Sequence, residues 1–478
     1  MNEALPGRLE HVHLIAIAGT GMGALAGLLH ARGLRVTGSD RALYPPMSEM
    51  LARWGIPVAI GFEPGHLEPR PDLVVIGNAV RADNPEARAA IEAGLPIRSF
   101  PDALYQFAIA DRHSVVVAGT HGKTTTASLL GAVLTGAGLD PSVLVGGVAL
   151  DFDGPFRDGA GPHFVVEGDE YDTAFFDKTP KFLHYHPRTL LLTSVEFDHA
   201  DIYRDLDHVK QAFRMLIHSL PAEGAIIAAL DDEHVRDVIG GARCPVIGYG
   251  VDAGERGFRA LDLSAGPDGT TFRVLRDERE LGGATVPLYG RHNVANALGA
   301  LATALTLGAP FAAAAAALAR FRGVRRRQEV RGHARGVTVL DDFAHHPTAV
   351  RETVAAMHAR FPGRRLVAVL EPRSNTSRRA LFQQDFVTAL AGAERAIIAV
   401  VPPEPLYSNT GAVSEYLDAK RLAADLQSRG VEAEAIDGVD AIVTRLAATC
   451  REGDVILVMS NGDFGGLWGK LLERLGGG

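Results

Sequence analysis

The chain has 478 residues, of which 47% are hydrophobic and 22% charged, and its formal net charge is -9. This length predicts about three domains of roughly 150 residues each, and the composition is that of an ordinary folded protein, neither disordered nor fibrous. The negative charge argues against nucleic-acid binding, because little basic surface is left to replace the counterions of a phosphate backbone. We therefore expect a multidomain enzyme that holds any anionic ligand locally.

The first segment predicts a βαβ nucleotide-binding unit. Residues 11–18 are largely apolar, the turn Gly-Thr-Gly-Met-Gly follows at 19–23, and a second strand over 34–40 ends in Asp40. An acidic residue about twenty positions after a glycine-rich turn is typical of dinucleotide folds. Ala24 occupies the third glycine position of the pattern. The turn alone is weak evidence for NAD, and a purely structural tight turn remains the alternative.

Residues 115–126, Val-Val-Val-Ala-Gly-Thr-His-Gly-Lys-Thr-Thr-Thr, predict a loop that holds the phosphates of a nucleoside triphosphate. A buried strand precedes this loop, and a helix over 127–135 follows it. Glycines let main-chain NH groups converge on anionic oxygens, while Lys123 supplies a charge and Thr124 a magnesium ligand. The strict pattern fails at Val117, where glycine is expected. A chance Gly-Lys-Thr sequence is the alternative.

The rest of the chain continues the α/β pattern. The predicted strands are 73–76 in the first domain, 164–166, 189–194 and 225–229 in the second, and 337–340, 366–370, 396–401 and 455–459 in the last. A small antiparallel excursion is expected within 248–283, a long helix after Gly290, and a plain helix that includes 312–317. The predicted fold class is α/β with three domains, each a Rossmann-like, mostly parallel sheet with flanking helices, the central one resembling a phosphate-loop ATPase. The expected boundaries are 1–111, 112–324 and 325–478.

Polar residues follow several of these strands. Glu167, Asp169 and Glu170 follow one strand of the central domain, and Glu-Phe-Asp-His-Ala-Asp at 196–201 follows another. Each acidic cluster alone fits a solvated loop, but two clusters in one phosphate-loop domain favour a metal site. His199 fits either a structural histidine or a ligand.

Basic residues stand at the boundary before the last domain. Arg325, Arg326 and Arg327 fit either a solvated linker or an arginine that reaches the γ-phosphate when the domains close. His345 and His346 precede a proline and are equally consistent with a structural turn.

Together these motifs resemble the Mur ligase family. The phosphate loop, Glu-x-Asp-Glu at 167–170, the acidic run at 196–201, Arg-His-Asn-x-x-Asn at 291–296 and Asp-Asp-Phe-x-His-His-Pro at 341–347 occur in the family's order and spacing. Within the family the chain is most similar to the branch that loads amino acids or peptides onto UDP-N-acetylmuramate. It departs from the pattern at Asp463, where glycine is expected, and at Gly168, where relatives usually carry alanine.

The resemblance implies an ATP-dependent ligase that joins UDP-N-acetylmuramate to the tripeptide L-alanyl-γ-D-glutamyl-meso-diaminopimelate through an acyl phosphate, in cell-wall peptide recycling. ADP and phosphate are the co-products, and ATP and Mg²⁺ are the implied cofactors. The ligase that adds L-alanine to the same sugar nucleotide is the alternative within the family. An NAD oxidoreductase and a non-catalytic ATP-binding regulator are the alternatives outside it.

The expected partners are these small-molecule substrates, with no nucleic acid and no membrane, for a monomer or weak homo-oligomer. Cys244 and Cys450 form neither a disulfide framework nor a metal motif, and residues 1–10 lack the apolar core of a signal peptide. No uninterrupted apolar run approaches about 18 residues, so we expect a cytoplasmic protein without a membrane anchor.

The resemblance also assigns roles to individual residues. The implied catalytic residues are Lys123, Glu167, His199, Arg327 and Asp342, of which Glu167 and His199, with Thr124, are the metal ligands. ATP would also contact Gly119, Thr120, His121, Gly122, Thr124, Thr125, His292, Asn293 and Asn296. The UDP-sugar would contact Gly19, Thr20, Gly21, Met22, Gly23, Ser39, Asp40 and Asn78. The incoming peptide would contact His346, Arg373, Asn375 and Asn461.

Overall fold

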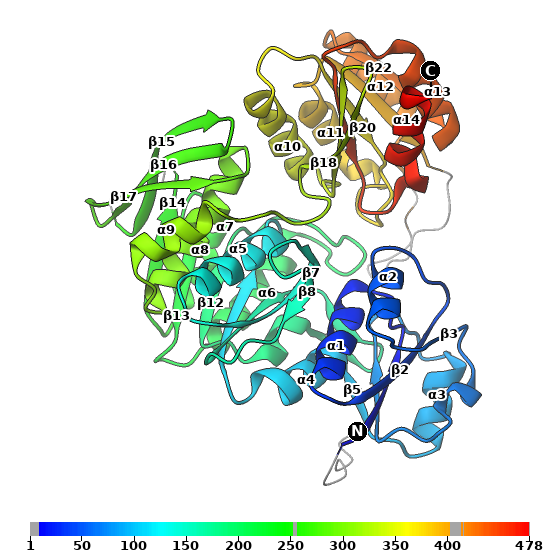
Figure 1. Cartoon of the computed structure of the whole chain (residues 1–478), viewed down its shortest axis with the longest axis vertical. Coiled ribbons are helices and arrows are strands. Elements are labelled where there is room, and N and C mark those ends of the chain that lie inside the picture. Colours follow the sequence, from blue (N-terminus) through cyan, green and yellow to red (C-terminus); the bar gives the residue numbers. More distant parts are fainter. Residues whose placement is uncertain (1–8, 252–255, 402–412, 414, 478) are drawn as a thin grey trace.

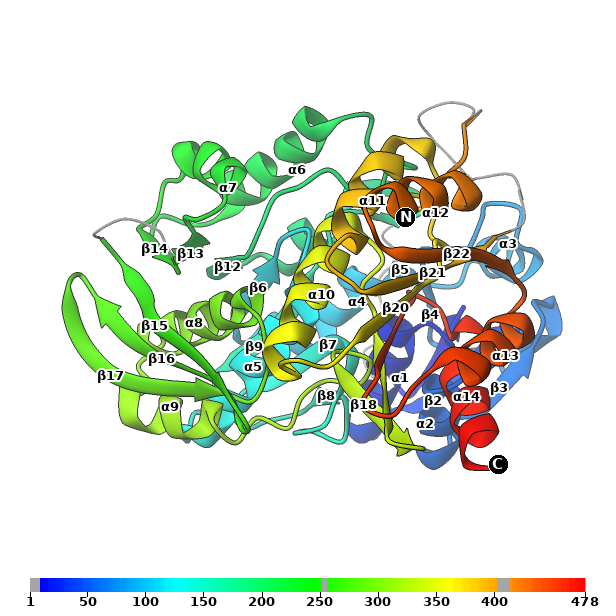
Figure 2. The same cartoon turned by 90° about the horizontal axis from the view of Figure 1, so that it is seen from above.

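Three large β-sheets organise the chain in the computed structural model, which describes residues 9–251, 256–401, 413 and 415–477. We call the parts built on these sheets the first, central and third units. Figures 1 and 2 show the first and third units next to each other, both against one side of the central unit. Residues 1–8, which make up most of the segment expected to lack a signal peptide, lie outside the described residues.

The first unit is a parallel sheet of five strands in the order β3-β2-β1-β4-β5. Its strands are β1 (His11–Ile15), β2 (Arg35–Asp40), β3 (Val58–Ile60), β4 (Leu73–Ile76) and β5 (Ile97–Ser99), and its helices are α1 (Thr20–Ala31), α2 (Met47–Arg53), α3 (Pro85–Glu92) and α4 (Phe100–Leu104). The strand order reverses at β1, and the glycine turn follows the carboxyl end of that strand. Open α/β sheets bind ligands at such a point.

The central unit has a ten-stranded sheet in the order β17-β16-β15-β14-β13-β12-β6-β9-β7-β8. The parallel middle contains β6 (His113–Ala118), β7 (Ser142–Ala149), β9 (His163–Gly168), β12 (Thr189–Leu192), β13 (Ala225–Ala229) and β14 (Val246–Gly250). At one edge β8 (Gly154–Arg157) pairs antiparallel with β7. At the other edge β15 (Phe258–Gly266) pairs parallel with β14, and β16 (Gly269–Arg276) and β17 (Arg279–Val286) continue the sheet by antiparallel pairing. The predicted antiparallel excursion is therefore an extension of the same sheet.

Helices cover the central sheet. They are α5 (Lys123–Gly136), α6 (Leu206–Ser219), α7 (Glu233–Val238), α8 (Arg291–Thr306) and α9 (Phe311–Leu318). Helices α5 and α8 pack against each other and are apolar over most of their length, because they lie between the sheet and further helices. A small hairpin of β10 (Asp172–Ala174) and β11 (Asp177–Pro180) projects from the unit and leads into a 3₁₀ turn, Lys181–Tyr185.

The third unit has six strands in the order β18-β19-β23-β20-β21-β22. They are β18 (Glu329–Ala334), β19 (Val337–Asp342), β20 (Leu366–Leu370), β21 (Arg395–Val400), β22 (Glu432–Asp437) and β23 (Val455–Met459). Only β18 pairs antiparallel in this part of the described chain. The helices are α10 (Pro347–Arg360), α11 (Gln383–Leu390), α12 (Ala419–Ser428), α13 (Val439–Thr449) and α14 (Leu467–Gly476).

The predicted fold class is confirmed. Strands predicted over 73–76, 225–229, 366–370 and 455–459 have those same bounds in the structure. Each is a short apolar run that is buried on both faces of a parallel sheet, which is the pattern most easily recognised in a sequence. None of the helices in the described part of the chain combines the length and the apolar character needed to cross a bilayer.

Candidate active site

A cavity of about 740 Å³ lies where the three units meet. Its walls include the turn after β1, the loop between β6 and α5, and the segments before β18 and after β19. These predicted site residues line it: Gly19, Thr20, Gly21, Met22, Asp40, Asn78, Thr120, His121, Gly122, Lys123, Thr124, Glu167, His199, Arg327, His346 and Asn461. The other predicted residues lie outside its lining: Gly23, Ser39, Gly119, Thr125, His292, Asn293, Asn296, Asp342, Arg373 and Asn375.

The phosphate loop requires glycine at two positions, of which Gly122 matches the strict pattern and Gly119 does not. Gly119 has φ +137° and Gly122 has φ +80°, conformations that other residues rarely adopt. A side chain on Gly119 would also collide with Thr193 and Ser194 in the neighbouring loop. Val117, by contrast, is a fully buried residue of β6. The loop therefore begins at Gly119, and the missing glycine at 117 belongs to the strand.

Lys123 begins α5 and points back across the loop. Its Nζ donates to Gly119 O and to Glu170 Oε2, both at 2.7 Å. Burial disfavours the charged form, but the nearby carboxylates, chiefly Glu170, outweigh it and raise the pKa of Lys123. A fixed positive charge is thus present at the mouth of a loop whose glycines can present NH groups to an anion.

Thr124 and Glu167 provide oxygen ligands beside the loop. The Thr124 hydroxyl donates to Glu167 Oε2 at 2.9 Å, and the NH of Gly146 donates to the other carboxylate oxygen. Burial and the negative charge of Asp169 raise the pKa of Glu167 to about 7. The nearby Lys123 charge opposes this shift without cancelling it, and a hydroxyl and a carboxylate are ligands that Mg²⁺ prefers. The donor set therefore fits a magnesium ion.

His199 lies across the cavity from this pair. It adopts a left-handed backbone conformation, φ +51°, and its Nε2 is 3.7 Å from Glu170 Oε1. Asp198 accepts from the His199 NH at 2.7 Å, and histidines around it hold the pKa of this carboxyl low although burial opposes that shift. Glu170 thus lies between Lys123 and His199, and joins the two predicted catalytic residues.

A second polar cluster joins the phosphate loop to the third unit. Glu196 accepts from His121 at 2.7 Å and from the Thr348 hydroxyl at 2.6 Å. His346 stacks against His121, with 4.7 Å between the ring centroids, and its Nε2 is 3.2 Å from the carbonyl of Phe197. Burial acts to raise the pKa of Glu196, but His121 and the other partners outweigh it and lower that pKa to about 2. This carboxylate therefore stays ionised. These contacts fix the third unit on the loop.

The three boundary arginines have different environments. The Arg326 guanidinium donates to Asp341 at 3.2 Å, to Ser460 O at 2.8 Å and to Gly462 O, so it is structural. Arg327 lines the cavity, and its guanidinium is 4.8 Å from the centre of the Phe343 ring. The described interactions include no hydrogen bond or ion pair of the Arg327 guanidinium. Arg325 also lines the cavity and is exposed, and no hydrogen bond or ion pair of its guanidinium occurs among the described residues, so Arg325 and Arg327 are both available to an anionic ligand.

Asp342 shapes the segment that carries Arg327. Its carboxylate accepts from the NH of Gln328 at 2.7 Å and from the NH of Ala344 at 2.8 Å, and its side chain is buried. Burial lowers the pKa of Arg327, although the Asp342 charge acts in the opposite direction. The structure thus places Asp342 behind the cavity wall, where it positions the arginine.

The two predicted asparagines of α8 lie behind the phosphate loop. Asn296 Nδ2 is 3.3 Å from Asn293 Oδ1, and Asn293 Nδ2 donates to Tyr289 O at 2.8 Å. The Asn296 amide also occupies the space that a side chain on Gly122 would need. His292 is 3.8 Å from Glu352 of the third unit, and burial lowers its pKa. Asn296 thus adjoins the phosphate loop at Gly122, and Asn293 lies beside Asn296.

The turn after β1 holds its shape through Asp40. The Asp40 carboxylate accepts from the NH of Ala18 at 2.8 Å and from the NH of Arg41 at 2.7 Å. Ser39 is fully buried and donates to Glu86 at 2.9 Å, and Gly23 is packed against the Met47 side chain within α1. Asp40 and the turn thus line the cavity, while Ser39 and Gly23 support them from the core.

The residues predicted to contact the peptide belong to loops of the third unit. Arg373 Nη1 is 3.8 Å from Asp463 Oδ1, and the Arg373 side chain occupies the space next to Gly462. Asn375 Nδ2 is 3.5 Å from Asp201 of the central unit. Asn461 Oδ1 is buried at the cavity and lacks a hydrogen-bond partner among the described residues. Of this group, His346 and Asn461 reach the cavity directly.

Sequence reasoning did not give roles to Glu170, Glu196 and Thr348. Glu170 belongs to a motif that was recognised, and its position three residues after Glu167 was the available signal. The partners of Glu196 come from two distant segments, so no local pattern indicates them. Lys181 also lines the cavity, 4.2 Å from the centre of the Tyr171 ring, and carries no motif.

The three sheets and the site define a ligase of the Mur type. Residues 11–112 match the Mur ligase family catalytic domain, residues 117–304 the Mur ligase middle domain, and residues 326–462 the Mur ligase glutamate ligase domain. The chain belongs to the Mur ligase family, whose members are ATP-dependent ligases.

Individual relatives extend over the whole chain. The UDP-N-acetylmuramate--L-alanyl-gamma-D-glutamyl-meso-2,6-diaminoheptandioate ligase of Escherichia coli (strain K12) is 41% identical, over 97% of this chain and 98% of that one. The UDP-N-acetylmuramate--L-alanine ligase of Halorhodospira halophila is 36% identical, over 99% of this chain and 94% of that one. The crystal structure of the murein peptide ligase of Psychrobacter arcticus 273-4 superposes with a TM-score of 0.74 at 34% identity, over 98% and 99% of the two chains.

Proposed function

We propose that this chain joins UDP-N-acetylmuramate to the tripeptide L-alanyl-γ-D-glutamyl-meso-diaminopimelate, with ATP converted to ADP and phosphate. The sugar carboxylate attacks the γ-phosphorus to give an acyl phosphate, and the peptide amino group then displaces phosphate to form the amide. Activation is needed because a resting carboxylate is a poor electrophile. The reaction would serve the reuse of cell-wall peptides.

The observation that carries this proposal is the shared cavity. The glycine turn of the first unit and the phosphate loop of the central unit line one space of about 740 Å³. This volume falls within the range of small-molecule sites, and its two glycine-bearing turns suit a sugar nucleotide and a nucleoside triphosphate. Arg327 reaches the same space from the third unit. A reaction between two nucleotide-bearing substrates needs this convergence.

The chain's own residues would stabilise the transferring phosphoryl group. Lys123 and the loop NH groups would hold the β- and γ-phosphates, with Gly119 to Thr125 as the loop. Arg327, positioned by Asp342, would neutralise charge on the opposite side. Thr124, Glu167 and His199 would hold magnesium, which when bound polarises phosphate oxygens. Asn293 and Asn296, with His292 beside them, would face the adenine side.

The sugar nucleotide and the peptide would enter from different units. Gly19, Thr20, Gly21, Met22 and Asn78 would contact the UDP moiety directly, and Asp40 would hold the turn, with Ser39 and Gly23 supporting it. His346, Arg373, Asn375 and Asn461 would receive the peptide. A guanidinium such as that of Arg373 matches a carboxylate of the diaminopimelate end.

The testing experiment measures phosphate release with ATP, Mg²⁺ and UDP-N-acetylmuramate, comparing the tripeptide with L-alanine. We expect turnover with the tripeptide to dominate. A preference for L-alanine would instead support the reaction named for the 36% identical relative. The absence of ADP formation with both substrates would refute the ligase proposal.

A matched pair of lysine variants tests the site itself. Lys123→Ala should abolish ADP formation and leave UDP-sugar binding intact, because the glycine turn belongs to another unit. Lys470→Ala, on an exposed helix of the third unit, should change neither. If a folded Lys123→Ala protein lost UDP-sugar binding as well as ADP formation, the assignment of two separate binding regions would be wrong.

We also propose domain boundaries at 1–111, 112–324 and 325–478. The last helical turn of the first unit ends just before Arg112, and β18 begins at Glu329. A monomer or weak homo-oligomer in the cytoplasm completes the proposal. Limited proteolysis that cut near residues 111 and 325 would support these boundaries.

A further inference from the structure

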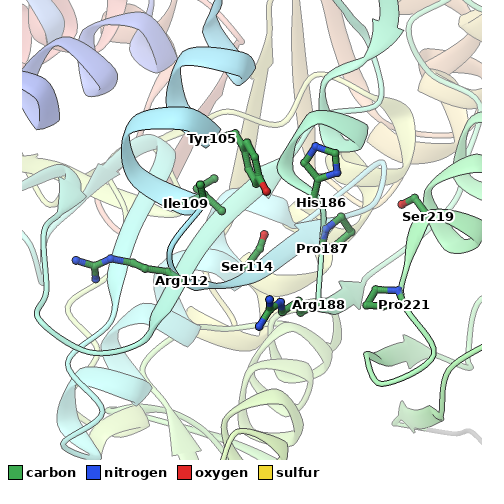
Figure 3. A pocket seen from close by; sticks show the side chains of 10 residues that line it. Tyr105, Ile109, Arg112, Ser114, His186, Pro187, Arg188, Ser219 and Pro221 are labelled. Carbon is green, nitrogen blue, oxygen red and sulfur yellow. The ribbon is translucent and has the colours of Figure 1, made fainter. Parts of the chain in front are cut away.

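A second cavity, of about 260 Å³, lies at the opposite end of strand β6 from the phosphate loop. Its lining joins the end of the first unit, Tyr105 to Arg112, to the amino ends of β6 and β12 and to the end of α6 (Figure 3). Ser114 near the start of β6 and Gly119 just after its end are five residues apart, or about 17 Å along an extended strand. The cavity is thus separate from the active site.

The Ser114 hydroxyl is the main sign of a ligand. Ser114 is 2% exposed, and its Oγ has no hydrogen-bond partner among the described residues. Figure 3 shows this hydroxyl pointing toward the hydroxyl of Tyr105. The Ser114 carbonyl already accepts from the NH of Arg188 at 3.0 Å, so the backbone is satisfied while the side chain is not. A buried hydroxyl without a partner is costly, and a bound acceptor would remove that cost.

The charge of the cavity favours an anion. Arg188 is exposed, and no ion pair of its guanidinium occurs among the described residues. Arg112 contributes less positive charge to the cavity. Its Nη1 donates to Ser142 and Gly159, and its Nη2 is 3.9 Å from Asp158. Figure 3 shows its side chain extending away from the other lining residues. The ten described residues of the lining include no carboxylate.

The remaining wall is rigid and polar. The His186 ring packs on Tyr105 with 4.6 Å between the centroids, and its backbone has φ +43°. The Ser219 hydroxyl lies across the cavity and already donates to Leu216 O at 2.6 Å. The lining groups without a hydrogen bond among the described residues include the Arg188 guanidinium and the Ser114 and Tyr105 hydroxyls, all of which can donate hydrogen bonds.

We propose that this cavity binds a small oxyanion, a phosphate or a carboxylate group. Arg188 supplies the charge, and the Ser114 and Tyr105 hydroxyls donate to the anion oxygens. The cavity is smaller than a site for a drug-sized molecule, so the ligand is a small anion or the anionic end of a larger one. Because the lining comes from both the first and the central unit, the bound anion stabilises their mutual placement.

Calorimetric titration with inorganic phosphate tests this proposal on the full chain, with ADP and Mg²⁺ occupying the phosphate loop. We expect Arg188→Gln to weaken phosphate binding about tenfold, as expected for the loss of a charge-assisted hydrogen bond. Arg243→Gln is the matched control, because Arg243 is also exposed and is not among the residues that line the cavity. Titration with acetate in place of phosphate shows which oxyanion the site prefers.

Crystals soaked in tungstate locate the anion directly. Anomalous density beside Ser114 and Arg188, lost in Arg188→Gln, supports the proposal. Equal phosphate affinity in Arg188→Gln and in the unmodified chain overturns it, as does tungstate density at the phosphate loop alone. Ligase turnover of Arg188→Gln, measured in parallel, separates this outcome from a failure of the proposed function, since Arg188 is outside the active site.

Discussion

Asp463 is expected to weaken the binding of the peptide substrate. The family pattern has glycine at this position, and here the carboxylate lies 3.8 Å from Arg373, a proposed peptide contact. An anionic peptide end must compete with Asp463 for that guanidinium. We therefore predict that Asp463→Asn lowers the KM for the tripeptide. Asparagine removes the charge and keeps the side-chain oxygen that accepts from the NH of Gly465 at 3.3 Å.

The size of the effect follows from the exposure of the pair. The Arg373 and Asp463 side chains are 52% and 76% exposed, so their attraction is screened by solvent. Two unit charges about 4 Å apart attract by about 1 kcal/mol in water, and exposed pairs contribute roughly 0.2–1 kcal/mol. Releasing Arg373 should thus lower the tripeptide KM by up to about fivefold.

The assay is initial-rate phosphate release at saturating ATP and UDP-sugar, with the tripeptide varied. Asp440→Asn is the control, because Asp440 is an exposed carboxylate of the same unit that pairs with Lys470 at 2.7 Å. It should leave the tripeptide KM unchanged, and neither variant should alter the KM for ATP. An unchanged KM in Asp463→Asn, or an equal change in both variants, would refute the reasoning.

Three further predictions concern the loop and the contacts between units. Gly122→Ala should abolish ATP binding, as measured by ADP titration, because the new side chain would collide with Asn296. Gly138 has a similar φ but open space around it, so Gly138→Ala should cost only about 1 kcal/mol of stability in thermal unfolding. Thr348→Val removes a hydrogen bond between the third and central units and should destabilise the protein by about 1 kcal/mol and lower kcat; an unchanged melting temperature and rate would contradict this. The Asp102 carboxylate and the His184 ring are 2.8 Å apart. Although burial opposes both shifts, this contact lowers the pKa of Asp102 and raises the pKa of His184. The pair therefore stabilises the fold between about pH 4 and pH 6.5, and stabilises it less as His184 loses its proton at higher pH. Asp102→Asn should destabilise the protein by about 1 kcal/mol within that window. Thermal unfolding measured at several pH values should show this loss shrinking toward about pH 8.5.

The sequence predicted the parts of the fold that repeat a local pattern. Buried parallel strands such as β4 and β20 are short apolar runs, and their bounds were predicted correctly. Strand β8 and the hairpin β10–β11 were missed, because they are short, contain polar residues and lie at edges, where pairing rather than composition decides the structure. A small antiparallel excursion was expected within 248–283, but the sequence did not indicate that its strands extend the central sheet.

The site was predicted where one segment carries the chemistry. Lys123, Thr124 and Glu167 belong to recognisable motifs, and the structure brings all three to one cavity, although Glu167 was expected just after its strand and lies within β9. The partner of each such residue is less accessible to sequence reasoning, because it comes from another segment. Glu170 compensates the Lys123 charge, and Ser39 is buried against Glu86 of α3. Such pairings depend on tertiary packing, which a motif does not encode.

The contacts of Arg326 have a mechanical consequence. The NH of Arg325, at the proposed boundary, donates to Val148 O of the central unit at 2.9 Å, whereas the Arg326 guanidinium is bonded to Asp341 and Ser460 of the third unit. The NH of Arg327 also donates to Val324 O at 3.2 Å, so residues 324–327 form a short segment with bonds to both units. Any rotation between the units must be taken up by the φ and ψ angles of this segment, and the distance from Arg327 to the phosphates would then depend on the angle of that rotation.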